Sequence, residues 1–280
     1  MSGAYLIVNA DDLGLTEGHN RAIVEAHSRG ILTSTSLLAC GRAFDDAVER
    51  ARLAPTLGIG IHLTLLEGVP VLPAAEVPDL VDGNGRFGLS YARLFRRVGL
   101  GQVRLEQVVR EWRAQIRKVM ATGLPVTHLD SHKHIHMHPQ LLGVVLALAD
   151  EFGVRRMRLS RPVRLASGAK PALLGLLAMW ARRRAAQRGV RTPDALLGLE
   201  FSGRMTTVRV LKALSRPWQG TRELMMHPAH PSQALDQLRT EGYRWIARYR
   251  FEDERTALCA AEARTMLARL GIELVNYGTL

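Results

Sequence analysis

Short strand-like runs alternate with helical segments along most of this 280-residue chain. The expected strands fall at residues 5–8, 33–39 and 57–65, from residue 126 onward, and within 155–160, 222–228 and 273–278. The expected helices fall at residues 17–29, 44–53, 105–122 and 139–152. A chain that repeats strand and helix in this way favours a mostly parallel sheet covered by helices. The sequence therefore predicts an α/β fold.

No linker, low-complexity tract or internal repeat divides the chain, so we expect one domain over residues 1–280. Cys40 and Cys259 lie far apart and form no C-x-x-C pair, which is typical of a reducing compartment. No signal peptide is visible, and no apolar segment reaches the ~20 residues needed to cross a bilayer. These features predict a cytoplasmic protein.

Acidic and imidazole side chains stand at the ends of four expected strands. Asp11 and Asp12 follow the first strand, and His62, His132 and His227 come at or after three others. In parallel α/β folds the chemistry collects at the carboxyl ends of the strands, where such side chains meet. Two adjacent carboxylates repel each other, so a positive group is expected beside them. The sequence thus predicts a functional site at this edge of the sheet.

Each of these motifs also has a structural interpretation. His62 alone could be a core histidine bonded to a backbone carbonyl, and the Asp pair could cap the following helix. The run His128–His138 could be a surface tract, although its position directly before a helix is unlike that of a tag. If this run is extended, its even-numbered histidines share one face and present several imidazoles together.

A divalent cation would reconcile these motifs. One Asp and two His side chains bound to it would neutralise the local charge and leave coordination positions open for water and substrate. The second Asp, kept off the metal, could then act as a general base on that water. Two His ligands favour zinc or a similar transition metal, because magnesium prefers a shell of oxygen atoms. We therefore predict one divalent metal ion.

Four motifs in this order resemble the YdjC-like (ChbG-like) carbohydrate deacetylases: IVNADDLGLTEGHN, GIGIHLTL, THLDSHKHIHMHP and ELMMHPA. The resemblance runs from about residue 5 to about residue 230. It implies a single-domain distorted (β/α) barrel, similar to a TIM barrel, and a metal-dependent hydrolysis of N-acetyl groups on amino sugars. Because magnesium has been associated with this family, the resemblance leaves zinc and magnesium open.

Carried onto the matching positions, the resemblance implies that Asp12, His62 and His132 bind the metal. Asp11 matches the acid that the related NodB-type deacetylases use as the base. His227 is the candidate general acid for the leaving amine, and its alternative is a structural or substrate-contacting histidine.

The resemblance also implies supporting roles in the site for Asp130, His134 and His136. These side chains are expected to line the site, where they would contact substrate or orient the metal ligands. The expected products are acetate and a free amino sugar.

The net charge of +12 comes largely from arginine. One apolar stretch, residues 173–180, runs directly into Arg182, Arg183, Arg184 and Arg188. We expect a basic amphipathic helical insertion at about residues 165–192, which could lie in the headgroup region of an anionic membrane. An ordinary helix with a basic outer face is the alternative.

This segment and the following DALLGLEFSGRMT resemble the hopanoid-biosynthesis branch of the family, HpnK. That resemblance implies an N-acetylglucosaminyl hopanoid or a similar glycolipid as substrate. It also implies a place on the inner face of the cytoplasmic membrane. A deacetylase of soluble chito-oligosaccharides is the alternative within the same class of enzyme.

A non-enzymatic basic protein that binds membranes or nucleic acid is the alternative from another class. Nucleic acid is not expected, because the arginines are not interleaved with aromatic residues, which make up only 5% of the chain. The Met- and Leu-rich edges of the late strands could serve as a homodimer interface, and the sequence leaves this question open.

Overall fold

The computed structural model of this chain describes residues 3–159 and 169–280. Their strands form one sheet, and every pairing between two of these strands is parallel. The order is β4-β3-β2-β1-β6-β5, and β7 pairs with the start of β1. The strands are β1 (Ala4–Leu13), β2 (Ser34–Leu37), β3 (Gly58–Leu63), β4 (Val126–Ser131), β5 (Ala195–Leu197), β6 (Gly220–Met226) and β7 (Ile272–Leu274).

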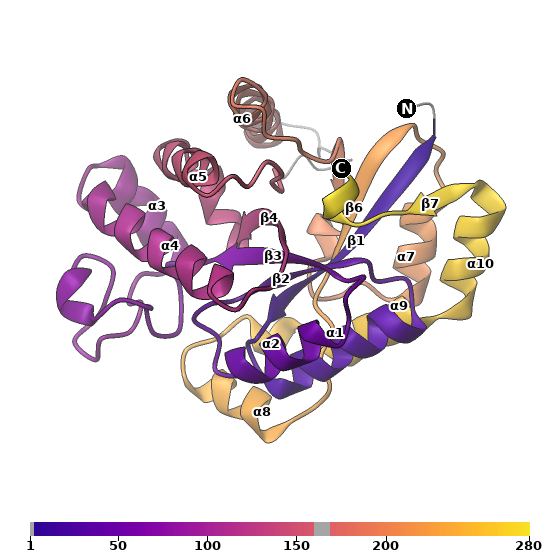
Figure 1. Cartoon of the computed structure of the whole chain (residues 1–280), viewed down its shortest axis with the longest axis horizontal. Helices are drawn as coiled ribbons and strands as arrows, with labels where there is room; N and C mark the ends of the chain where they lie inside the picture. Colours follow the sequence, from indigo (N-terminus) through magenta and orange to yellow (C-terminus); the bar gives the residue numbers. More distant parts are fainter. Residues whose placement is uncertain (1–2, 160–168) are drawn as a thin grey trace.

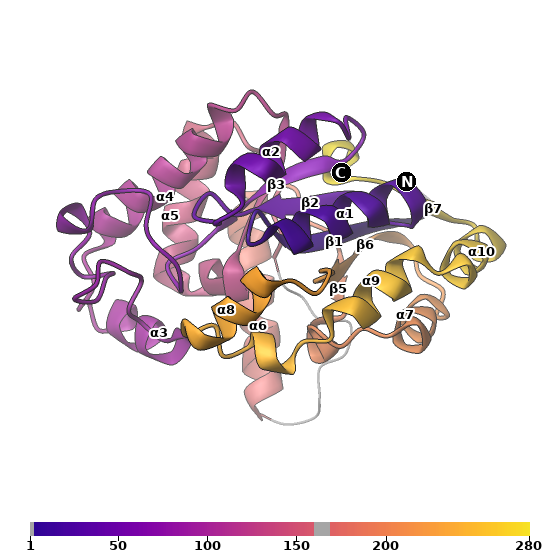
Figure 2. The ribbon, with the colours of Figure 1, turned by 90° about the horizontal axis from the view of Figure 1, so that it is seen from below.

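The sheet curls into an incomplete barrel with helices around its outside (Figure 1, Figure 2). Beyond β4, single parallel bridges join Leu129 to Met157 and Arg156 to Arg191. These bridges extend the curl toward the chain that leads into β5. The predicted α/β fold, a distorted barrel of mostly parallel strands, is confirmed.

Several helices in the described residues are amphipathic, and α4 is an example. Its Val108, Trp112 and Ile116 recur every four residues and are fully buried, whereas Arg117 and Lys118 are exposed. The helices are α1 (Glu17–Arg29), α2 (Phe44–Arg52), α3 (Tyr91–Gly99), α4 (Leu105–Met120), α5 (Pro139–Glu151), α6 (Ala169–Ala186), α7 (Thr207–Leu214), α8 (Gln233–Thr240), α9 (Phe251–Cys259) and α10 (Ala261–Leu270).

The two faces of β1 have different environments, because side chains alternate along a strand. Leu6 and Val8 pack into the main apolar core with residues of the surrounding helices. Asn9, on the opposite face, donates to Ser36 Oγ at 3.0 Å, and Ser36 donates to Asp130 at 2.8 Å. These buried bonds link β1, β2 and β4 inside the curl. The interior of the incomplete barrel therefore contains a polar network, which links the strands near their carboxyl ends.

Two expectations about strands are corrected by the structure. The segment 155–160 is not a strand in its described part, because only Arg156 and Met157 form isolated bridges, and residue 160 lies outside the described residues. The sequence did not predict β5, which at three residues is too short to show a periodic pattern. The first segment joins its neighbours through isolated bridges, and β5 pairs with β6 over only three residues, so the placement of both depends on tertiary packing.

The expected basic insertion at about residues 165–192 begins outside the described residues and continues as α6. Ala178, Ala181 and Ala185 of this helix are buried. On its other side Leu176 and Met179 remain more than half exposed. No helix within 3–159 or 169–280 has the length and apolar character needed to cross a membrane.

Candidate metal centre and active site

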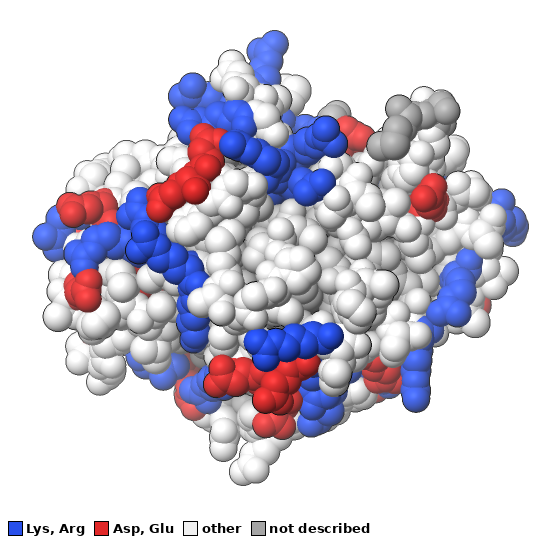
Figure 3. Space-filling model, in the orientation of Figure 1, with Lys and Arg blue, Asp and Glu red and all other residues white. Residues whose placement is uncertain are grey.

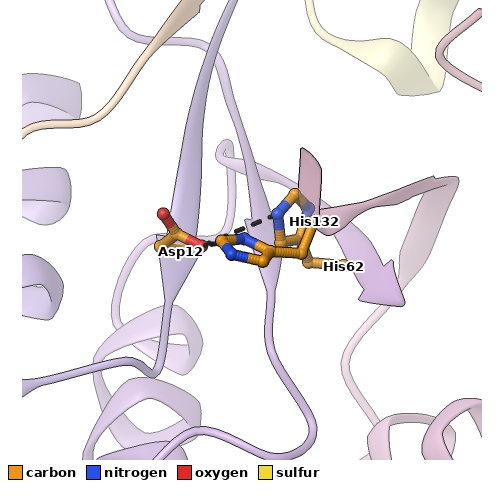
Figure 4. Close-up of side chains that lie close together, drawn as sticks. All are labelled: Asp12, His62 and His132. Atoms are coloured by element: carbon orange, nitrogen blue, oxygen red, sulfur yellow. Dashed lines mark ion pairs between the residues drawn. The ribbon is translucent and has the colours of Figure 1, made fainter. Parts of the chain in front are cut away.

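Asp12, His62 and His132 converge at the carboxyl end of the curled sheet (Figure 4). Asp12 lies on β1, His62 lies on β3, and His132 begins the turn η2 (His132–Met137) that follows β4. Asp12 Oδ1 lies 3.6 Å from His62 Nε2 and 3.2 Å from His132 Nδ1. One ligand atom from each side chain lies within 4.8 Å of the other two. This is the spacing of a candidate metal centre.

Each of the two histidines is oriented by a second carboxylate. Asp130 lies 2.7 Å from His62 Nδ1, and Glu67 lies 3.1 Å from His132 Nε2. Because a carboxylate accepts hydrogen bonds, it favours the tautomer that carries the proton on the nitrogen facing it. The other nitrogen of each ring then points toward Asp12 and is the one that would bind a metal. Metal-binding histidines are commonly held in this way.

The electrostatics of these residues fit a bound cation. Asp12 is almost fully buried, and its Oδ1 has no hydrogen-bond partner in the described part of the chain. Burial alone would lower the pKa of His132, but the carboxylates of Asp12 and Glu67 raise it to about 9. A site that holds a proton so strongly also attracts a metal ion, which competes for the same lone pair.

Backbone strain is concentrated around this centre. The described non-glycine residues with positive φ are Asp12 (67°), Glu67 (60°), Lys133 (53°) and His134 (55°). All four lie at the centre or beside it, and each costs of the order of 1–3 kcal/mol. At Asp12 the pairing of β1 with β2 also breaks register, between Ala10 and Leu13. The irregular backbone explains how two successive Asp side chains reach different partners.

Asp11 faces Arg158 instead of the candidate metal ligands. The Arg158 Nη1 and Nη2 atoms lie 2.8 and 2.7 Å from the two Asp11 carboxylate oxygens. Arg158 is fully buried and also bonds Asp130 and Glu223. Burial alone would raise the pKa of Asp11, but the guanidinium lowers it below its ordinary value. The expected positive group beside the Asp pair is therefore Arg158.

A second set of close ligand atoms comes from Asp11, His62 and Asp130. Here the Arg158 guanidinium already occupies both carboxylates, and the proton of His62 Nδ1 faces Asp130. A cation placed among them would lie against another positive charge. The first set is therefore the better metal site.

His227 completes the cluster from the end of β6. Its Nε2 lies 3.8 Å from Asp11 Oδ2, and its Nδ1 lies 3.6 Å from Glu254 Oε2. Burial alone would lower the pKa of His227, but the nearby carboxylates of Glu254 and Asp11 raise it above its ordinary value. A histidine held protonated in this way can donate a proton.

The histidines after β4 do not share one face. The extended chain ends at Ser131, and the left-handed residues of η2 redirect those that follow. His136 bonds Ser131 and the Arg158 carbonyl oxygen, so it supports the segment that carries Arg158. Burial and the Arg158 charge lower the pKa of His134 to about 3. His132 is the histidine of this run that joins the candidate ligands.

Arg158, Glu67 and Glu254 were not predicted from the sequence, although each contacts a predicted site residue. Arg158 is one of three arginines in RRMRLS, so the local sequence does not single it out as a buried charge. Glu67 and Glu254 stand in ordinary loop and helix contexts and carry no signal of their own.

The model of the YdjC-like protein family matches residues 5–269. This chain belongs to the YdjC-like family. One relative is a protein named carbohydrate deacetylase from Brevibacillus brevis, which is 36% identical over 98% of this chain and 99% of its own length. A second, from Enterococcus faecalis, is 34% identical over 100% and 99% of the two chains. The crystal structure of an Enterococcus faecalis protein, 32% identical in sequence to this chain, superposes on it with a TM-score of 0.78 over 99% of both chains.

Proposed function

We propose that this YdjC-like protein is a metal-dependent carbohydrate deacetylase that removes an N-acetyl group from an amino sugar. The observation that carries the proposal is the convergence of Asp12, His62 and His132 beside an acid, Asp11, that is held off the metal by Arg158. The names of the full-length relatives support the same activity.

In this proposal the chain's own groups move the protons. A divalent cation held by the three ligands would polarise the acetamide carbonyl and acidify a water molecule. Asp11, kept ionised by Arg158, accepts a proton from the attacking water. His227, whose pKa the carboxylates of Glu254 and Asp11 raise, donates a proton to the leaving amine. Acetate and a free amino sugar result.

Zinc or a similar transition metal is the proposed ion. Two imidazole nitrogens and one carboxylate make a donor set that such metals prefer, whereas magnesium favours oxygen donors. Metal analysis of the purified protein, followed by chelation and reconstitution with zinc or magnesium, separates the two ions. Activity restored by magnesium alone would overturn the choice of zinc.

The proposed substrate is an N-acetylglucosaminyl hopanoid or a similar glycolipid at an anionic membrane surface. Two features of α6 support membrane contact. Leu176, Met179 and Trp180 are exposed by 59, 51 and 38%, and Arg183 and Arg184 are exposed beside them. Basic side chains gather at the top of the view, over α6, and acidic side chains lie at the edge of this group (Figure 3). An apolar and basic helix face of this kind can lie in a headgroup layer.

The first experiment measures acetate release by the metal-reconstituted protein from two substrates. One is N,N′-diacetylchitobiose and the other is an N-acetylglucosaminyl lipid, with Asp11→Asn as the inactive control. Release from the lipid alone supports the glycolipid proposal. Release from chitobiose favours a soluble-sugar enzyme. Release from neither, in a protein that also binds no metal, overturns the deacetylase proposal.

A second experiment tests membrane contact through vesicle binding. Arg183→Gln/Arg184→Gln should weaken binding to vesicles that contain anionic lipid and leave binding to neutral vesicles unchanged. The matched control, Arg117→Gln/Arg269→Gln, removes two exposed arginines from other helices. Equal loss in both variants would mean that only net charge matters, and α6 would then be an ordinary outer helix.

A further inference from the structure

Aromatic residues are concentrated in one short segment of this chain. Tyr243, Trp245, Tyr249 and Phe251 lie within residues 243–251, although aromatics make up only 5% of the chain. The segment joins α8 to α9 and lies far in sequence from all three candidate metal ligands. Its rings nevertheless reach one of these ligands, His132, and the proposed acid, His227. Trp245 lies 5.5 Å from the His132 ring, and Tyr249 lies 5.0 Å from the His227 ring, between centroids.

Trp245 is held in place from several sides. Its indole Nε1 donates to Glu67 Oε2 at 2.8 Å. Tyr249 meets it at a centroid distance of 4.7 Å and an angle of 65°, and Phe251 meets it at 6.2 Å and 63°. Such edge-to-face contacts fix the plane of a ring as well as its position. The orientation of this indole is therefore set before any ligand arrives.

Glu67 connects Trp245 to the candidate metal centre. The carboxylate that accepts from Trp245 Nε1 also bonds His132 Nε2 and Lys133 Nζ. A single carboxylate therefore fixes both a candidate metal ligand and the indole beside it.

Trp245 also lines two cavities, together with Leu66 and Glu67. One is a hollow of about 20 Å³ whose wall includes Asp12, Glu67 and His132. The other is an open cleft of about 1140 Å³ whose wall includes Lys133 and Glu67. Trp245 lines both, and it is only partly buried. A ligand that extends from the candidate metal ligands into the cleft would therefore lie beside this indole.

The chemistry of an N-acetyl amino sugar places its ring at the same point. Only the amide nitrogen separates the acetyl carbonyl carbon from the ring carbon, so a carbonyl at the metal centre keeps the sugar ring close by. A pyranose ring has hydroxyl groups around its edge and C–H groups on its faces. An aromatic side chain offers an apolar face to those C–H groups, while the hydroxyl groups stay in contact with water or polar residues.

We propose that the amino-sugar ring stacks on the indole of Trp245, which serves as its platform. Glu67 is then a positioning residue that holds this indole in place beside the candidate metal centre. This inference rests on the proposed deacetylase function for the identity of the ring. It adds a substrate-binding residue outside the motifs that indicated the site.

The test measures binding of methyl β-glucosaminide, the product ring shared by both proposed substrates, so that no turnover is needed. Calorimetry on metal-loaded Trp245→Ala should show an affinity weaker by about tenfold or more. Trp245→Phe, which keeps an aromatic face but loses the bond to Glu67, should lie between Trp245→Ala and the unaltered protein. Phe201→Ala removes an exposed ring elsewhere and should bind normally.

Metal content and melting temperature identify a variant that has simply unfolded. With any turned-over substrate, Trp245→Ala should raise KM more than it lowers kcat. An affinity of Trp245→Ala within about twofold of the unaltered protein, with metal retained, would overturn the platform. If the sugar binds through Trp245 but no acetate is released, the stacking role of Trp245 would be supported and the proposed deacetylation would be contradicted.

Discussion

Arg158 and Asp11 form a buried two-pronged ion pair, with nitrogen–oxygen distances of 2.8 and 2.7 Å. Asp12, the next residue, points to His62 and His132 instead. The two adjacent carboxylates therefore have different positive partners, an arginine for one and the proposed cation for the other. This arrangement gives the two acids different chemistry despite their shared sequence context.

Asp11→Asn is expected to abolish most of the acetate release without loss of metal. The amide cannot accept the proton of the attacking water, so kcat should fall by about 10²- to 10⁴-fold. Metal stoichiometry, measured on the same samples, should stay unchanged. Asp12→Asn is the contrasting variant and should lose metal as well as activity. Equal metal loss in both variants would contradict the separate roles.

Arg158→Leu is expected to destabilise the protein by about 3–5 kcal/mol, because it leaves buried carboxylates without a counter-charge. Arg158→Lys keeps the positive charge but cannot make the paired hydrogen bonds of a guanidinium. It should therefore destabilise the protein less than Arg158→Leu does. Chemical denaturation measures the free energy of unfolding. The control is Arg113→Gln, which breaks a partly exposed pair with Glu151 and should cost about 1 kcal/mol or less.

Glu254→Gln is expected to move the alkaline limb of the pH–rate profile to lower pH. His227 must be protonated to act as an acid, so activity is lost as the pH rises through its pKa. Glu254 helps to raise that pKa, and removing its charge lowers it. The profile of kcat against pH measures the shift. Glu252→Gln, on the same helix but paired with Arg255, should leave the limb in place.

Asp130→Asn and Glu67→Gln are each expected to weaken metal binding by about 10- to 100-fold. Both carboxylates hold a candidate histidine ligand in the tautomer that binds metal. Competition with a chelator of known affinity measures the change. Asp150→Asn, a surface acid paired with Arg155 and Arg188, is the control and should bind metal normally.

Metal affinity is also expected to depend on pH. Below its pKa of about 9, His132 carries a proton that the metal must displace. The apparent affinity should therefore rise by about tenfold per pH unit from about pH 6 to about pH 8. Chelator competition across this range gives the slope. A flat response would mean that His132 is not a ligand.

Much of this protein is determined by its sequence alone. Strand and helix periods predict the α/β fold, because each period directly reflects which side chains face the core. The predicted helix at residues 17–29 and the observed α1 have the same bounds. The predicted ligands Asp12, His62 and His132 are brought together by the fold, since parallel strands meet at their carboxyl ends.

Only the tertiary structure decided how these residues are partnered. Arg158, Glu67 and Glu254 each act through a contact with a residue far away in sequence, and no local pattern encodes such a contact. The left-handed turn at Lys133 and His134 separates histidines that an extended chain would have aligned. Trp245 reaches His132 of the candidate metal centre only because the α8–α9 connection folds against it. Sequence periodicity therefore specifies the elements, whereas long-range packing and charge pairing specify the chemistry of each side chain.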